Sequence, residues 1–186
     1  MQRRRFLAWP LLAAAAAFAA LAAQPARGQG VDLVSLELQR QEGWLTLEFN
    51  ARLQLSRAVQ DALERGIPVY FVADALVLRN RWYWRDERMA RVSRTWRLAY
   101  QPLTSSWRVG IGALGKSYSS LPEALGAVSR LSGWRLAELA ALEADSRHYV
   151  EFAFRLDTTL LPGPMQIGLT SQSDWTLRIE RTLRLE

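Results

Sequence analysis

Ten residues of this chain read Trp44-Leu45-Thr46-Leu47-Glu48-Phe49-Asn50-Ala51-Arg52-Leu53. Every second side chain is apolar, and polar side chains or Trp44 fill the positions between them. Side chains point to opposite faces of a β-strand in turn, so this period of two predicts a strand with one buried face. Residues 31–38 repeat the pattern, and Gln41-Glu42-Gly43 between the two stretches predicts a hairpin turn.

The same alternation extends over most of the chain and predicts a mainly β protein. Besides the first two strands, we expect strands at residues 69–78, 81–85, 91–100, 107–114, 148–157 and 175–185. Two short helices interrupt them, one over residues 57–65 after Ser56 and one from Ser120 to about Leu131, ended by Ser132-Gly133. Residues 137–144 stay ambiguous, and the prolines of residues 161–164 predict a loop.

About eight short strands in one unit favour an antiparallel β-sandwich with two short helical insertions. An antiparallel half-barrel with helices on one side is the alternative. No internal repeat or low-complexity linker follows residue 30. We therefore expect one β-rich domain over residues 29–186.

The first 28 residues have the composition of an export signal. Arg3, Arg4 and Arg5 precede an uncharged run over residues 6–23, and Pro25 with small residues follows it. This order is typical of a secretory signal peptide, with cleavage after Ala23 or Gly28. The alternative is an uncleaved N-terminal membrane anchor. The paired arginines before Phe6-Leu7 also resemble a twin-arginine signal. We expect the mature chain to work in the periplasm.

Charge and cysteine content narrow the function classes. The chain has 24 basic and 18 acidic residues, and its first 28 residues contribute four basic and no acidic ones. The remaining balance of +2 gives no support for nucleic-acid binding. The chain has no cysteine, which excludes disulfides and a lipoprotein anchor.

Residues 79–108 form the most distinctive region of the mature chain. Eight arginines lie there among six aromatic residues, against Asp86 and Glu87 as its acidic residues. Arginine and tryptophan are enriched at binding hot spots. We therefore predict a partner-binding surface formed by Arg81, Trp82, Tyr83, Trp84, Arg85, Arg97 and Arg108. The alternative interpretation places one tryptophan face in the core and the arginines in solvent.

Three strings in this chain support a family resemblance. They are residues 81–86 (Arg-Trp-Tyr-Trp-Arg-Asp), residues 98–109, which end in Trp-Arg-Val, and residues 161–166 (Leu-Pro-Gly-Pro-Met-Gln) followed by Asp174-Trp175. With the signal segment, they resemble the DUF4390 family of exported proteobacterial proteins over about residues 31–186. The resemblance implies no assigned activity. It associates the chain with a membrane-bound sensor histidine kinase, whose ectodomain is a candidate partner.

Catalytic patterns are weak. His148 is the one histidine, and we interpret it as a surface residue of a strand. No nucleophile-elbow motif is present, the acidic residues form no pair by spacing, and a zinc site would lack nitrogen and sulfur ligands. The glycines at 110, 112 and 115 match a phosphate loop only superficially, because no helix follows them directly. We expect no enzyme, no cofactor and no metal.

We therefore predict an exported interaction module that binds an envelope protein, with membrane contact only through an uncleaved signal. A binder of small ligands or glycans, which would stack them on exposed tryptophans, is the second hypothesis. A carboxylate-based hydrolase is the third.

Overall fold

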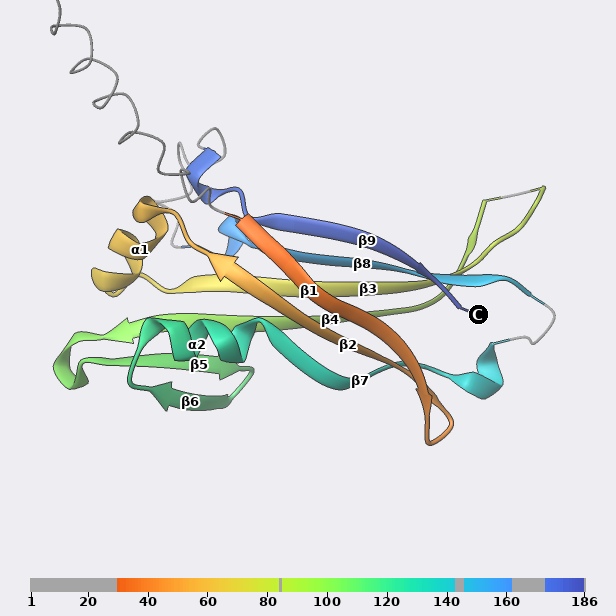
Figure 1. Cartoon of the computed structure of the whole chain (residues 1–186), viewed down its shortest axis with the longest axis horizontal. Coiled ribbons are helices and arrows are strands. Elements are labelled where there is room, and N and C mark those ends of the chain that lie inside the picture. The colour runs from red at the N-terminus through yellow and green to blue at the C-terminus, as the bar shows by residue number, and fades with distance from the viewer. Residues whose placement is uncertain (1–29, 84, 143–145, 162–172, 186) are drawn as a thin grey trace, which may run out of the picture.

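The computed structural model describes residues 30–83, 85–142, 146–161 and 173–185, so the predicted signal segment lies outside the described residues. Within them the chain forms nine strands and two α-helices (Figure 1). The strands are β1 (Gly30–Gln41), β2 (Trp44–Gln54), β3 (Val69–Arg79), β4 (Glu87–Gln101), β5 (Ser106–Ile111), β6 (Leu114–Tyr118), β7 (Arg130–Glu138), β8 (His148–Leu156) and β9 (Arg178–Arg184). The helices are α1 (Arg57–Glu64) and α2 (Leu121–Val128). The mainly β prediction is confirmed.

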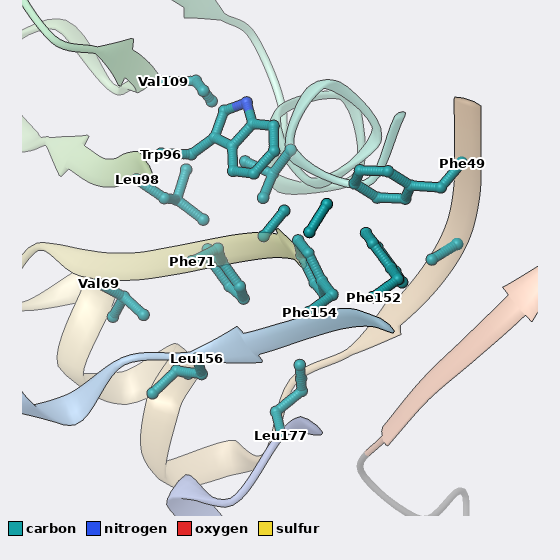
Figure 2. Packing of buried hydrophobic residues seen from close by; sticks show 14 of the residues in the cluster. Phe49, Val69, Phe71, Trp96, Leu98, Val109, Phe152, Phe154, Leu156 and Leu177 are labelled. Atoms are coloured by element: carbon teal, nitrogen blue, oxygen red, sulfur yellow. The ribbon is translucent and has the colours of Figure 1, made fainter. Parts of the chain in front are cut away.

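The strands form two antiparallel sheets. One has the order β1-β2-β7, and the other has the order β6-β5-β4-β3-β8-β9. Phe49 on β2 meets the second sheet, with its ring centroid 5.1 Å from that of Phe152 and 5.5 Å from that of Phe154. Figure 2 shows this contact beside Trp96. The facing sheets share one hydrophobic core, as the predicted sandwich requires.

Both predicted helix starts are confirmed by side-chain caps. The Ser56 hydroxyl oxygen accepts a hydrogen bond from the Val59 N–H at 3.2 Å. Ser120 accepts one from the Glu123 N–H at 3.4 Å, and the Glu123 carboxylate accepts hydrogen bonds from Ser119 in return. Each cap satisfies N–H groups that the first helical turn leaves without an internal partner.

The second helix is shorter than the sequence predicts. It ends at Val128, and the Ser129 carbonyl at once accepts a hydrogen bond from the Ala51 N–H of β2 at 2.9 Å. From Arg130 the chain pairs with β2 as strand β7, which also takes up Ala137 and Glu138 from the segment left ambiguous. The helical prediction was wrong here because pairing along β2 satisfies the backbone groups that a longer helix would satisfy internally.

Three further strand predictions need correction. Residues 81–85 are not a strand: in the described part they belong to the loop between β3 and β4. Residues 107–114 are not one strand, because a turn at Gly112, with φ of +57°, separates β5 from β6. The last strand begins at Arg178, after a 3-10 turn over Ser173–Trp175. Of the predicted loop at residues 161–164, positions 162–164 lie outside the described residues.

None of the described helices is long and apolar enough to cross a membrane.

Candidate functional site

The predicted binding residues fall into two groups at opposite ends of β4. Arg81, Trp82, Tyr83 and Arg85 lie in the β3–β4 loop, whereas Arg97 pairs in register with Gly110 and Arg108 with Ala99. Arg97 is ten positions along β4 from Glu87. A strand rises about 3.3 Å per residue, so the two groups lie about 30 Å apart. Trp84 lies outside the described residues. The predicted surface is therefore not one continuous site.

The β3–β4 loop presents two exposed aromatic side chains. Trp82 is 90% exposed and Tyr83 is 67% exposed, and their ring centroids lie 5.1 Å apart at 71°. We call these two residues the aromatic tip. The alternative interpretation of the sequence places one tryptophan face of the predicted strand in the core. Trp82 is instead exposed to solvent. Figure 1 shows the loop at the end of the molecule that lies away from α1.

The base of the loop is held by charged residues. The Glu87 carboxylate forms ion pairs with Arg79 and Arg81. Asp86 accepts a hydrogen bond from the Arg81 backbone N–H at 3.1 Å and another from the Tyr149 hydroxyl group on β8. The Asn80 N–H donates to the Arg147 carbonyl at 2.8 Å, which ties the loop to the start of β8. We call Arg79, Arg81, Asp86 and Glu87 the loop base.

These contacts shift the pKa values of two side chains. The hydrogen bond from Tyr149, followed by that from the Arg81 N–H, lowers the pKa of Asp86, because both bonds favour the ionised carboxylate. The same bond, together with burial and the charges of Asp86 and Glu151, raises the pKa of Tyr149 to about 12. At neutral pH the two groups are therefore a charged acceptor and a neutral donor, which is the pair that the bond needs.

His148 lies next to this loop in the adjacent strand. It is paired in register with Arg79 and is only 6% exposed, so the interpretation as a surface histidine was wrong. It lies on the inner face of β8, in line with Val150 and Phe152. Its Nε2 atom is buried and has no hydrogen-bond partner among the described residues.

The sequence analysis named Trp82 and Tyr83 within a larger predicted surface but missed the residues that support their loop. Tyr149 is 63 positions away from Asp86. Arg147 and Arg184 lie near the loop because β8 pairs with β3 and β9 pairs with β8. No local pattern signals such contacts.

The comparison with protein families gives one match. The model of the family described as "Domain of unknown function (DUF4390)" matches residues 28–184, which is nearly the whole chain. The chain belongs to this family. No curated protein and no solved structure matches it.

Proposed function

We propose that this member of the DUF4390 family is an exported, non-enzymatic interaction module. It binds an envelope protein through the aromatic tip of the β3–β4 loop. The observation that carries the proposal is the exposure of Trp82, at 90%, on a loop whose base is held by Glu87 and Asp86.

The contrast with the other tryptophans supports this role. Among the described residues, Trp96, Trp107, Trp134 and Trp175 are all less than 10% exposed. Trp44 is half-buried, with the Arg135 guanidinium 5.4 Å from the centre of its ring. Water contact with a large apolar side chain is unfavourable, so an exposed Trp beside an exposed Tyr is typical of a surface that a partner covers.

The loop base supports binding by limiting the motion of the tip. Ion pairs from Glu87 to two arginines and the Asp86–Tyr149 hydrogen bond hold the two strands leading to the tip. A loop that is already ordered loses less conformational entropy when it binds. The two rings meet edge to face at 71°, so they do not offer two parallel faces to consecutive sugar units. Exposed tryptophan and tyrosine side chains are enriched at protein interfaces, which supports a protein partner.

The tip and the first described residue lie at opposite ends of the domain. Gly30 pairs in register with Gln54, just before α1, so the chain enters the domain at the end opposite the loop (Figure 1). Under the alternative of an uncleaved N-terminal anchor, the tip would lie at the end of the domain away from the membrane. The ectodomain of a sensor histidine kinase, which the family resemblance implies, is a candidate partner.

In-cell photo-crosslinking tests the proposal. A photoreactive amino acid at Tyr83 is expected to capture one envelope protein, which mass spectrometry identifies, and Trp82→Ala is expected to abolish the capture. Leu103, fully exposed on the β4–β5 loop at the other end, is the matched control position. Equal capture from both positions, or no capture from Tyr83, would contradict the proposal.

A further inference from the structure

A surface hollow of about 570 Å³ lies directly beside the loop base. It forms where the β3–β4 loop, the start of β8 and the end of β9 meet. Its lining consists of Asn80, Asp86, Arg147, His148, Tyr149, Thr182, Arg184 and Leu185. Because Asn80 and Asp86 belong to the loop that carries the aromatic tip, one ligand can contact both the tip and the hollow.

The charge of this lining is positive. Arg147 and Arg184 are exposed, and neither forms an ion pair within the described part of the chain. Asp86 is the acidic residue of the lining, and its two oxygens already accept hydrogen bonds from the Arg81 N–H and from Tyr149. Asp86 forms no ion pair with either arginine, and its single negative charge offsets one of their two positive charges, so the lining keeps a net positive charge. A guanidinium that forms no ion pair can pair with a carboxylate from another molecule.

We propose that this hollow binds an acidic segment of the protein partner, with Asp or Glu carboxylates paired to Arg147 and Arg184. The inference rests on the proposed function, since the same partner covers Trp82 and Tyr83. A carboxylate fits better than a phosphate group because Asp86 lines the hollow, and its negative charge opposes a dianion more strongly than a single negative charge.

A second arginine pair on the same sheet provides the comparison. Arg97 and Arg108 are exposed, and the described residues offer neither of them an ion-pair partner. Their strands are adjacent, and they occupy diagonal positions on the outer face, about 7–8 Å apart. This pair is about 30 Å from the loop by strand length. It matches the hollow pair in charge and exposure but lacks the aromatic tip beside it.

The direct test uses fluorescein-labelled hexaglutamate as the probe and the full chain in a nonionic detergent. Fluorescence anisotropy is expected to show binding that R147E/R184E weakens by about a hundredfold, because each of the two lost charged contacts is worth about a factor of ten. R97E/R108E changes the net charge by the same amount and is expected to weaken binding about twofold at most. Equal weakening in both variants, no weakening in R147E/R184E, or no binding at all would overturn the inference. Thermal unfolding of both variants confirms that each is folded.

A second measurement separates this inference from the proposed function. The crosslinker at Tyr83 is placed in the R147E/R184E background. Loss of partner capture there, with capture retained in R97E/R108E, supports the acidic segment. Undiminished capture in R147E/R184E overturns the inference while the tip remains the binding site. Absence of any capture in the native background, with selective hexaglutamate binding, overturns the proposed function and leaves the anion-binding hollow.

Discussion

Trp96 and Trp82 lie on the same strand–loop unit, and their surroundings are opposite. Trp96 on β4 is 1% exposed, with its ring centroid 6.3 Å from that of Phe49 and 6.2 Å from that of Phe154. Trp82 contacts the Tyr83 ring and is otherwise open to solvent at 90% exposure. The difference teaches that residue type alone does not assign a role. The core cluster stabilises the fold, whereas the tip contributes little to stability and is available for binding.

The largest effect is expected at the centre of the core. Phe154 is fully buried and contacts the rings of Phe49, Phe71 and Trp96. Phe154→Ala removes these contacts and leaves a cavity, so the free energy of unfolding is expected to fall by about 3–5 kcal/mol. Urea denaturation measures this loss, and Phe154→Leu, as the milder control, is expected to lose less. A loss below about 1 kcal/mol in Phe154→Ala would break the comparison.

A smaller loss of stability is expected at Asp74, on the outer face of the six-stranded sheet. Asp74 on β3 forms ion pairs with Arg155 and Arg91. Burial alone raises the pKa of Asp74, but hydrogen bonds from Arg155 and Ser93 and the charges of both arginines outweigh burial, so the pKa lies below its ordinary value. Asp74→Asn is expected to lower the free energy of unfolding by about 1 kcal/mol at pH 7.

The stability difference between native protein and Asp74→Asn is expected to depend on pH, because the pKa of Asp74 is lowered in the folded state. A carboxylate with a lowered pKa in the folded state stabilises the fold above its unfolded pKa of about 3.9, and this contribution is lost as pH falls through the folded value. The difference between native protein and Asp74→Asn is therefore expected to shrink below about pH 4. Denaturation at several pH values measures it. A difference that grows at acidic pH would contradict the prediction.

The contact between Asp86 and Tyr149 is expected to show most directly in the titration of Tyr149. Tyr149, one of the five tyrosines, is expected to ionise at about pH 12. The ultraviolet absorbance of the phenolate measures this ionisation. Asp86→Asn removes the negative acceptor, so the pKa of Tyr149 is expected to fall towards about 10. The stabilisation from the raised pKa is present below about pH 10 and is lost as pH rises through about 12. Tyr149→Phe is the control that identifies the titrating group.

The smallest effect on stability is expected at the tip itself. Trp82→Ala removes a side chain that is almost wholly in water, so the free energy of unfolding is expected to change by less than about 0.5 kcal/mol. The same change is expected to abolish capture from Tyr83. A stability loss comparable to that of Phe154→Ala would show that the tip packs against the fold, and the contrast between the two regions would disappear.

The sequence predicted most elements correctly where the signal is local. Residues 44–53 and 148–157 alternate without interruption, and both were found as β2 and β8 with Phe49, Phe152 and Phe154 facing inward. The serine caps at 56 and 120 were found as well. These signals work because strand alternation and helix capping depend on residues at most a few positions apart.

The candidate site was predicted only in part. The aromatic tip was named from its composition, but residues 81–85 were assigned to a strand, and Arg97 and Arg108 were assigned to the same surface. The error has a physical cause. Aromatic and alternating residues satisfy the strand pattern equally well in a loop, and the pattern does not show whether a neighbouring strand is there to pair with.

The sequence by itself determined the mainly β class and the two helix starts, because each follows from residue type and short-range spacing. Its resemblance to the DUF4390 family was confirmed by the match to the family model over residues 28–184. The tertiary structure alone decided which tryptophans are exposed, that β7 forms beside β2, and that Asp86 meets Tyr149. It also placed Arg147 and Arg184 around one hollow. These features depend on which strands pair, and pairing joins residues far apart in the chain through a shared core rather than through local preference.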